Sequence, residues 1–571
     1  MIQRLRISLL LILLGALLYV PGINWGLPGL VSWSQDSVAA FRTLGATADW
    51  PHDWKGRYPP LHYLVLRAAY EPVLRYWEAR GGAELNATTG QYRLKEPQAT
   101  KVAALILIAR VISVVMAIGT GLAIYCAARR LLFDDLAGAI AAAVFMIGAD
   151  FTYFAHLDNV DVASIFWLAL SLVFFARLAE SHRLRDAALL GLFGSLAIST
   201  KDAVAGVYPA LAICLILERW RRSCDTPENS DETSLTCEPN AAHKGRRYIS
   251  SGSVWWTALR QPQWLVGMLC FALPYLFING ALHNWDAYAN RMTYWLNPPP
   301  EARHAQQHVY GSQIELMVAV IRYVASAVGW PMLVAMLLAW VYSAVRLPLI
   351  ALLAGLPALT YYAIVIFPQG FVYSRFLFAP LVFFSLPLGF AAVRVFRRSD
   401  WPIGARALLI GLVALPSLGY AVAVNAEMLT DSRYAVEAWF AEHVPPPSSV
   451  GAFALTAEPI LRPQYLPRLH EMGYATYPVV MAREWFDRPQ PEYLVVDSFT
   501  SEDFDDNQKA CLRELLRGEL GYRLIAIFEG HYLPHQRSWL SIAGCGTPVL
   551  GKISPRLVIL QRAVEELKMG D

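Results

Sequence analysis

The residues that could most readily do chemistry are acids, a histidine and cations at the ends of apolar stretches. Asp36 lies in Ser-Trp-Ser-Gln-Asp-Ser, shortly after an N-terminal apolar run. A carboxylate there could accept a proton from a hydroxyl nucleophile and so act as a general base. The competing interpretation is an N-cap for a helix that starts at Ser37, and the residues alone favour this cap.

A second group combines an imidazole with two carboxylates, because His156, Asp158 and Asp161 fall within six residues. Together they could hold a divalent cation, Mg²⁺ or Mn²⁺, or position a substrate. The alternative is that Asn159 or Asp161 caps the next helix, and the sequence does not separate these interpretations. Zinc is disfavoured, because no second His or Cys lies at a usual ligand spacing.

Three cations interrupt or end apolar stretches. Lys201, in Ile-Ser-Thr-Lys-Asp, could bind a phosphate, or it could pair with Asp202 or snorkel. Arg375, in Tyr-Ser-Arg-Phe, is a similar case, and a guanidinium suits phosphate well. Arg110 lies inside an apolar stretch, so it needs a partner or a wet cavity. These groups suit an anionic lipid-phosphate ligand beside a general base, and they equally suit a transport pathway.

The composition is that of a membrane protein. Of the 571 residues, 56% are hydrophobic and only 16% are charged, whereas soluble domains carry about 25% charged residues. The net charge of +3 is small. No block of Lys and Arg has interleaved aromatic residues, so the sequence argues against nucleic-acid binding.

Apolar stretches of about 17–25 residues can cross a bilayer, and they predict about eleven transmembrane helices. The first is interpreted as a retained helix rather than a cleaved signal peptide, because no small-x-small cleavage site precedes Asn24. The predicted spans are 5–24, 102–128, 136–155, 162–178, 186–200, 203–219, 263–282, 329–346, 348–367, 376–395 and 404–424.

The positions of the arginines give the expected orientation. With the N-terminus in the cytoplasm, the arginine-rich loops fall inside, as the positive-inside rule requires. Three segments then lie outside, namely 25–100, 283–311 and everything after 425. The stretch 312–328 is expected at the outer interface, before a break at Trp330–Pro331, although its composition leaves a span open.

Two domains follow from these patterns. Residues 1–424 are expected to form the membrane domain, with a disordered cytoplasmic segment at 223–252. In 425–571, helices are predicted at 431–443 and 504–520, and strands at 448–456, 493–497, 523–528 and 557–562. The expected fold is mainly α, a polytopic transmembrane helical bundle followed by an extracytoplasmic α/β domain.

Short motifs accompany the helices in a fixed order. They are Trp25-Gly26-Leu27-Pro28 with Asp36, Arg57-Tyr58-Pro59-Pro60-Leu61, Ala109-Arg110, His156 with Asp161, Lys201, Pro274-Tyr275 with Asn279, Gly329-Trp330-Pro331, Ser374-Arg375-Phe376 and Asp431-Ser432-Arg433-Tyr434-Ala435. Together they resemble the GT-C membrane glycosyltransferases, most closely family 39, which is related to protein O-mannosyltransferases and lipid A aminoarabinose transferase. The chain departs from the family at Ser37, where Glu usually follows the first Asp.

The resemblance implies an inverting transferase that moves a sugar from a polyprenyl-phosphate donor to a hydroxyl acceptor at the outer face of the membrane. The implied roles are Asp36 as catalytic base with Asp161 as second acid, Lys201 and Arg375 on the donor phosphate, His156 and Asp158 positioning the acceptor or a metal, and Arg57, Tyr58 and Arg110 lining the cavity.

Other functions would use similar surfaces. A transporter or flippase for a lipid-linked or anionic substrate predicts paired broken helices and mid-membrane acids, and the sequence has no inverted repeat. A glycan ligase of the same superfamily, or a scaffold that lost catalysis at Asp36–Ser37, is a further alternative. The sequence leaves open whether the sugar is a hexose or a pentose and whether the acceptor is a protein, lipid or glycan. A bacterial inner membrane is the expected location.

Overall fold

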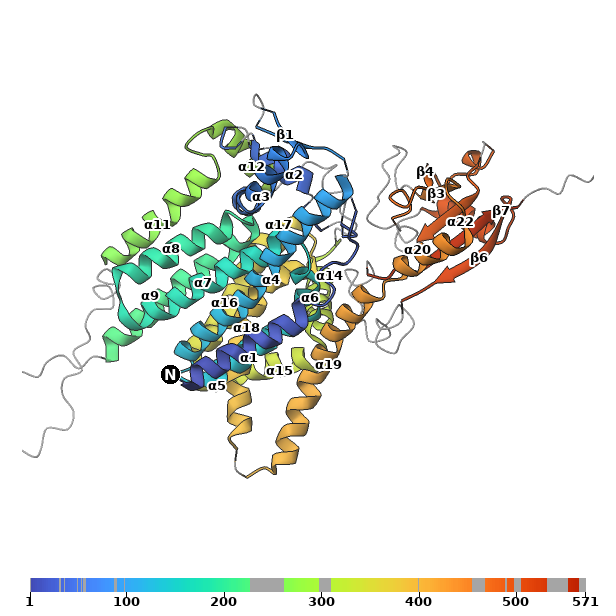
Figure 1. Ribbon diagram of the computed structural model, residues 1–571. Coiled ribbons are helices and arrows are strands. Elements are labelled where there is room, and N and C mark those ends of the chain that lie inside the picture. Colours follow the sequence, from blue (N-terminus) through green and yellow to red (C-terminus); the bar gives the residue numbers. More distant parts are fainter. Residues whose placement is uncertain are drawn as a thin grey trace, which may run out of the picture.

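A helical bundle carries a smaller α/β domain at one end in this computed structural model (Figure 1). The structure describes residues 2–29, 32–34, 36–38, 40–48, 50–52, 54, 58–86, 90–96, 98–225, 261–296, 310–398, 400–453, 468–487, 490–497, 505–530 and 553–563. Arg57 lies outside these residues. The segment 223–252 begins in the last residues of a helix and otherwise lies outside them too.

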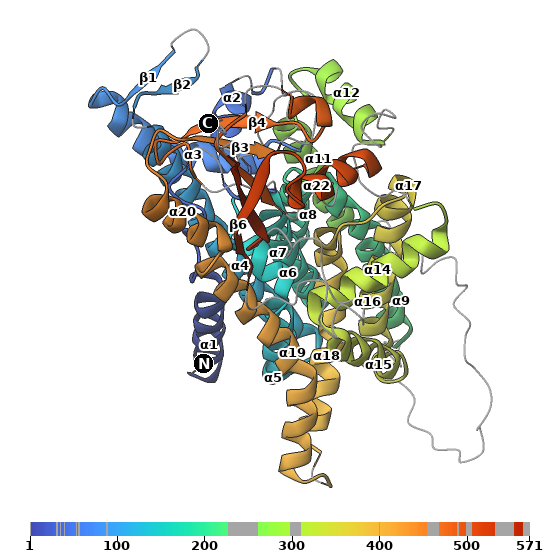
Figure 2. The ribbon, with the colours of Figure 1, turned by 90° about the vertical axis from the view of Figure 1, so that its right-hand side faces the viewer.

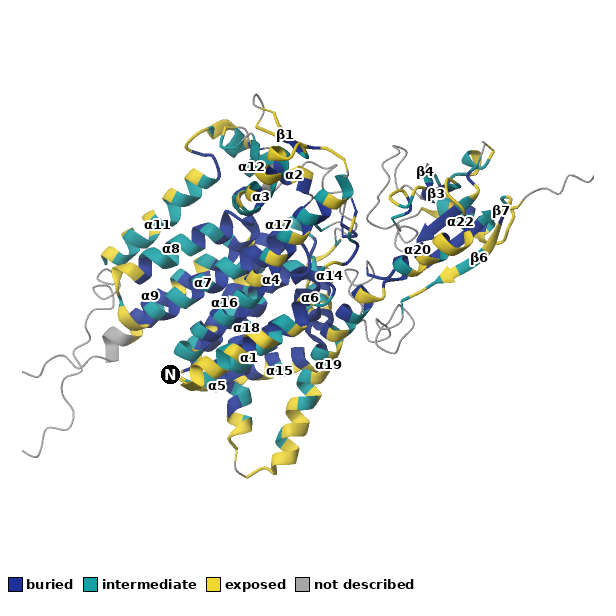
Figure 3. Cartoon of the chain, viewed as in Figure 1, coloured by how far each residue is buried: buried dark blue, intermediate teal, exposed yellow. Residues whose placement is uncertain are grey.

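The centre of the bundle is formed by three long apolar helices, α4 (Gln98–Leu131), α7 (Val160–Ser181) and α18 (Phe378–Phe396), which are largely buried (Figure 3). Helices that are apolar on all sides pack inside a bundle or face lipid. Around them lie α1 (Ile2–Tyr19), α5 (Asp135–Met146), α6 (Ala149–Ala155), α8 (Leu184–Ile198), α9 (Tyr208–Asp225), α11 (Pro262–Ile278), α14 (Gln313–Val328), α15 (Trp330–Arg346), α16 (Pro348–Tyr361), α17 (Phe367–Gln369) and α19 (Ile403–Leu429).

Each of the eleven predicted spans is helical, but fewer helices meet the length and hydropathy of a full span. Among the described residues six do so, or up to eight if each sharply bent pair is one span. The helices α8 and α11 have only 15 and 17 residues, and α9 is charged in its second half. The chain is thus an integral membrane protein with a polytopic helical bundle.

Two sharp bends interrupt the helices. The axes of α5 and α6 differ by 72°, so the predicted helix over 136–155 is two helices. The axes of α14 and α15 differ by 111°. Gly329 joins this second pair with a φ of +82°, which glycine adopts without a Cβ clash. Pro331 opens α15, where its missing N–H is not needed. The predicted break at Trp330–Pro331 is therefore present.

One end of the bundle gathers short elements from distant parts of the chain (Figure 2). They are α2 (Ala40–Ala48), α3 (Leu61–Ala79), the antiparallel hairpin of β1 (Ala83–Leu85) and β2 (Tyr92–Leu94), and α12 (Trp285–Leu296). The α/β domain lies at the same end. A backbone hydrogen bond of 3.0 Å from Leu61 N–H to the Ser199 carbonyl ties the start of α3 to the end of α8.

The C-terminal domain is a five-stranded mixed sheet with helices on both faces. The strands are β3 (Ser449–Phe453), β4 (Ala475–Val479), β5 (Tyr493–Asp497), β6 (Tyr522–Phe528) and β7 (Leu557–Arg562), in the order β4-β3-β5-β7-β6. Leu494 packs with α22 (Asp506–Leu516), whereas Val495 packs with α20 (Ser432–His443). Successive side chains of a strand point to opposite faces, so each helix covers one face of the sheet.

Asp431 fastens this domain to the bundle. Its side chain caps α20 by accepting from the Arg433 N–H at 3.0 Å, and it accepts from the Trp25 indole at 2.8 Å. The Ser554 N–H donates to the same carboxylate at 2.9 Å, and the Arg433 guanidinium pairs with it at 2.6 Å. This carboxylate therefore joins the first loop of the membrane domain to two separate parts of the C-terminal domain.

Candidate active site

Asp36 and Arg375 form an ion pair at the end of the bundle that carries the short elements. Asp36 lies in a turn between α1 and α2, and Arg375 lies in a short 3-10 helix, η3 (Ser374–Leu377), directly before α18. Their side chains are only 8% and 14% exposed. The expected N-cap role of Asp36 is wrong, because no helix begins at Ser37 and α2 starts at Ala40.

Asp161 and Lys201 form a second ion pair beside the first. Asp161 lies in the first turn of α7, and Lys201 follows α8. Their side chains are 3% and 7% exposed. The Asp161 carboxylate also lies 4.0 Å from Nε of Arg375. The four side chains therefore form one continuous line of alternating charge, Asp36–Arg375–Asp161–Lys201, which we call the charge cluster.

Aromatic rings surround the two cations of the charge cluster. The Lys201 ammonium lies 4.9 Å from the centre of the Phe376 ring. The Arg375 guanidinium lies 4.6 Å from the Tyr373 ring and 5.9 Å from the Phe154 ring, and Tyr58 is close enough to influence it electrostatically. Faces of aromatic rings attract cations and also exclude water. Charges in such surroundings act on a ligand more strongly than charges in water do.

Pairing of Lys201 with its neighbour Asp202 was one of the alternatives considered from the sequence, and the structure does not contain this pair. Asp202 instead accepts from the Arg291 guanidinium of α12 at 2.7 Å. Arg291 also donates to the Asn279 side-chain oxygen at 2.8 Å, and the Asn279 amide donates to the Ser199 hydroxyl at 3.0 Å. This network occupies Asp202, so the Lys201 ammonium is directed into the charge cluster.

The turn between α6 and α7 holds the loop that carries Asp36 through hydrogen bonds. Asn159 caps α7 by accepting from the Asp161 N–H, as the capping alternative proposed. Its amide also donates to the Asp36 carbonyl at 3.2 Å. The Val38 N–H donates to the Asp158 carbonyl at 2.7 Å. The loop that carries Asp36 is therefore held against the same turn that begins the Asp161 helix.

Asp158 is fully buried beside the position at which the chain departs from the family. One of its oxygens accepts from the Ser37 hydroxyl, and the other has no hydrogen-bond partner among the described residues. Burial raises the pKa of Asp158 from 3.8 to about 6, while the charge of Arg110 and the Ser37 hydroxyl act in the opposite direction. Ser37 thus faces a carboxyl that holds a proton more strongly than usual.

The side chains of His156 and Arg110 contact backbone carbonyl groups rather than lining a cavity. Both ring nitrogens of His156 contact backbone carbonyls at 2.7 Å, those of Thr152 and Pro21. The Arg110 guanidinium donates to the carbonyls of Ile23 and Trp25, both at 2.7 Å, and it is completely buried. It also donates to the Ser32 hydroxyl at 3.0 Å. Arg110 thus finds partners in the first loop instead of a wet cavity.

The three residues proposed for a divalent cation do not fit a metal site in this arrangement. His156 is engaged by carbonyls, Asp158 by Ser37 and Asp161 by Lys201. Within the described ranges, no group of three or more His, Cys, Asp or Glu side chains is placed to hold a metal ion.

Two residues near the charge cluster were not singled out from the sequence. Arg291 could have been noticed as an arginine in the expected outer segment 283–311. His62, directly after Pro59-Pro60-Leu61, is 1% exposed, and its two ring nitrogens have no hydrogen-bond partner among the described residues. Burial lowers the pKa of His62 to about 4, although the nearby Asp161 carboxylate opposes this change.

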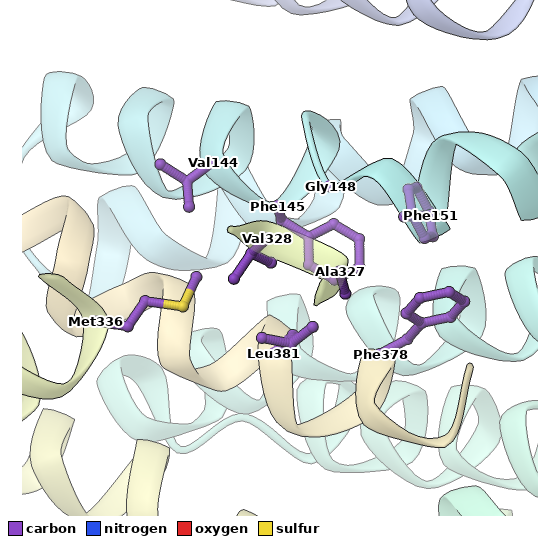
Figure 4. A pocket seen from close by; sticks show the side chains of 9 residues that line it. All are labelled: Val144, Phe145, Gly148, Phe151, Ala327, Val328, Met336, Phe378 and Leu381. Atoms are coloured by element: carbon purple, nitrogen blue, oxygen red, sulfur yellow. The ribbon is translucent and has the colours of Figure 1, made fainter. Parts of the chain in front are cut away.

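A small cavity inside the bundle is lined by apolar side chains and Gly148 (Figure 4). Phe151 and Phe378 line it, with their ring centres 5.5 Å apart. Phe378 also packs on Phe154, the ring beside Arg375, at 5.5 Å. The rings of Phe154 and Phe378 therefore connect the charge cluster with this cavity.

Residues 102–230 match the family model described as dolichyl-phosphate-mannose-protein mannosyltransferase. This segment runs from α4 to α9 and contains Arg110, His156, Asp158, Asp161 and Lys201. This segment, less than a quarter of the chain, is therefore similar to the corresponding part of a membrane glycosyltransferase. The resemblance predicted from the sequence motifs is thereby confirmed at the level of the superfamily, and the particular reaction is not specified by the match. A comparison with curated proteins finds no match for the chain.

Solved structures with a distant likeness cover nearly the whole chain. One is the archaeal oligosaccharyltransferase AglB from Archaeoglobus fulgidus, in complex with an inhibitory peptide and a dolichol-phosphate. It has 12% identity and a TM-score of 0.46, with 98% of this chain and 88% of that chain covered. Another is ArnT from Cupriavidus metallidurans bound to undecaprenyl phosphate, with 13% identity, a TM-score of 0.44, and coverage of 100% and 99%.

Proposed function

We propose that this GT-C protein transfers a sugar from a polyprenyl-phosphate donor to a hydroxyl acceptor at the outer face of the membrane, with inversion at the anomeric carbon. The observation that carries the proposal is the charge cluster, in which two acids and two cations from four separate elements lie buried together. The matched family, described by a dolichyl-phosphate sugar, supports the donor class. The expected location is a bacterial inner membrane.

In the proposed step, the Asp36 carboxylate takes the proton of the acceptor hydroxyl. The hydroxyl oxygen attacks the anomeric carbon from the face opposite the phosphate and forms the new glycosidic bond. The bond between the anomeric carbon and the phosphate oxygen breaks, and its electron pair leaves with the polyprenyl phosphate. The phosphate thereby changes from a diester to a monoester and gains negative charge.

Arg375 and Lys201 are proposed to stabilise that developing charge. Preorganised cations in a water-poor site are effective because they need no reorganisation at the moment of reaction. Each cation is paired with an acid in the structure, Arg375 with Asp36 and Lys201 with Asp161. A guanidinium can contact a carboxylate and a phosphate together, since it has five donors.

The ion pairing couples the two halves of this step. When Asp36 accepts the proton it loses its charge, and its attraction for Arg375 weakens at once. Arg375 can then shift its attraction to the phosphate while the phosphate gains charge. We propose that this exchange of partners links deprotonation of the acceptor to departure of the lipid phosphate.

The test is a comparison of wild type with Asp36→Asn in a donor panel. Purified protein is mixed with membrane extract as the source of acceptor and with radiolabelled polyprenyl-phosphate hexoses and pentoses, and release of polyprenyl phosphate is measured. We expect wild type to turn over one donor and Asp36→Asn to lose at least about 100-fold in rate, the usual contribution of a general base.

Asp186→Asn is the matched control. Asp186, in the first turn of α8, is also a buried acid paired with an arginine, Arg177 at 2.9 Å. Arg177 lies near the opposite end of α7 from Asp161, so this pair is remote from the charge cluster. This variant should keep the rate of the wild type. Equal turnover by wild type and Asp36→Asn would exclude Asp36 as the base. Failure of wild type to turn over any donor, with acceptors of all three classes supplied, would argue against the transferase, and transport would be tested next.

A further inference from the structure

A large apolar groove opens on the side of the bundle, away from the charge cluster. It lies between α5, α15, α18 and α19 and has a volume of about 870 Å³. Alanines on all four helices line it, namely Ala143, Ala335, Ala392 and Ala414, and these small side chains leave the space between the helices unfilled. Pockets that bury small ligands have volumes of about 300–1,000 Å³.

The groove has two cations at one end and is otherwise lined mostly by apolar side chains. Arg394 lies in the last turn of α18, and Arg398 follows the helix, which ends at Phe396. Both line the groove. The Arg394 guanidinium lies 5.2 Å from the Phe390 ring, and among the described residues no carboxylate pairs with it. Arg398 pairs with the exposed Asp400 at 2.9 Å, so Arg394 has the more available charge.

This end of the groove is far from the proposed donor site. Arg375 directly precedes α18, whereas Arg394 lies in its last turn, sixteen residues beyond Phe378. At about 1.5 Å per residue, that separation is about 24 Å along the helix. The small apolar cavity inside the bundle touches the groove at Val144, and no charged residue lines it (Figure 4). The two arginines therefore form a separate site.

The surroundings of the groove are those of a membrane interior. Leu412 and Leu415 on α19 are 59% and 63% exposed, in a helix apolar and long enough to cross a membrane. The exposed surface of the α18–α19 hairpin is visible in Figure 3. In hydrocarbon, an empty apolar groove forfeits dispersion contacts along its walls. A lipid chain restores those contacts at once, and its headgroup would then lie near the helix ends.

We propose that this groove binds an anionic phospholipid of the membrane, with one acyl chain in the groove and the phosphate on Arg394 and Arg398. Basic pockets between transmembrane helices suit anionic headgroups, and a guanidinium binds phosphate through paired hydrogen bonds. The site is independent of the proposed transfer reaction, because it rests on the groove and its two cations alone.

The test measures lipid binding to the full chain without using activity. Purified protein in detergent is titrated with phosphatidylglycerol or with phosphatidylcholine of the same acyl chains, and bound copies are counted by native mass spectrometry. We expect the wild type to bind phosphatidylglycerol about tenfold more tightly than phosphatidylcholine, a difference of one charge-assisted contact. The variant Arg394→Gln/Arg398→Gln should lose this preference and bind both lipids alike.

Two further variants separate the headgroup from the chain. Arg346→Gln removes an arginine in the last turn of the neighbouring α15 that does not line the groove, and it should bind like the wild type. Ala335→Trp fills the groove and should weaken binding of both lipids about tenfold. Arg394 is exposed, so Arg394→Gln alone provides a test if the double variant folds poorly. Equal binding of the two lipids by wild type, or unchanged preference in Arg394→Gln, would overturn the proposal.

Discussion

The Asp36 carboxylate and the Arg375 guanidinium are paired across 339 residues of sequence, and this pair holds the first loop of the chain against the start of α18. Both side chains are largely withdrawn from solvent. Removing one partner of such a pair leaves an uncompensated charge, which destabilises a protein more than removing both partners does. The effects of this pair on the free energy of unfolding and on the transfer rate can therefore be measured separately, with single and double variants.

Asp36→Asn and Arg375→Gln should each lower the free energy of unfolding by about 1–3 kcal/mol, because each leaves a buried polar group without its partner. The double variant should be less destabilised than the sum of the two single variants. All three should lose at least about 100-fold in transfer rate. Thermal unfolding and the donor assay, made on the same preparations, measure both effects. Additive stability losses would show that the two side chains do not interact.

Lys201→Gln should lower turnover about 100-fold, the usual effect of removing one group that stabilises developing charge. Lys201→Arg should recover part of the rate, since the cation is retained next to Asp161. The control is Lys95→Gln, an exposed lysine 3.9 Å from Glu84, because surface pairs contribute little. A rate for Lys201→Gln within twofold of wild type would exclude Lys201 from the phosphate site.

Arg110→Gln should destabilise the fold by about 3 kcal/mol or more, since the guanidinium makes three buried hydrogen bonds to the first loop. The transfer rate should fall too, because that loop leads into Asp36. The comparison is Arg80→Gln, whose guanidinium stacks on Tyr76 at 4.8 Å at the protein surface and which should melt like wild type. An unchanged melting temperature for Arg110→Gln would contradict this structural role.

Much of the bundle was accessible to sequence reasoning, because spans of lipid-facing helix must be continuously apolar. Hydropathy does not report bends, so α5 and α6 were predicted as one helix although Gly148 separates them by 72°. In the C-terminal domain, β4 was missed. It contains Pro478, which lacks an N–H and is tolerated because β4 is an edge strand.

The members of the charge cluster could be chosen from the sequence, but their pairing could not. Asp36, Lys201 and Arg375 attract attention because ionisable groups are costly in lipid. Sequence adjacency suggested that Lys201 pairs with Asp202, yet Arg291 on a distant helix takes Asp202. Which cation meets which acid depends on how helices far apart in the sequence pack, and a hydropathy profile contains no such information.

Asp158 should make stability depend on pH in a defined direction. Burial raises its pKa in the folded protein to about 6, whereas an unfolded chain has the ordinary value of 3.8. The folded state therefore binds a proton that the unfolded state does not bind between these two values. The contribution of Asp158 to the free energy of unfolding should therefore rise as the pH falls from about 7 toward 4. The full difference of about two pKa units corresponds to about 3 kcal/mol.

Asp158→Asn isolates this contribution, because the amide does not titrate and other groups, among them the buried His62, cancel in the comparison. We expect the melting temperature of wild type, taken relative to the variant, to increase between pH 8 and pH 5. The melting temperature should rise because the buried Asp158 carboxyl is ionised at pH 8, which burial disfavours, and is mostly neutral at pH 5. Parallel pH profiles for the two proteins would show that Asp158 is not the proton-binding acid that its complete burial indicates.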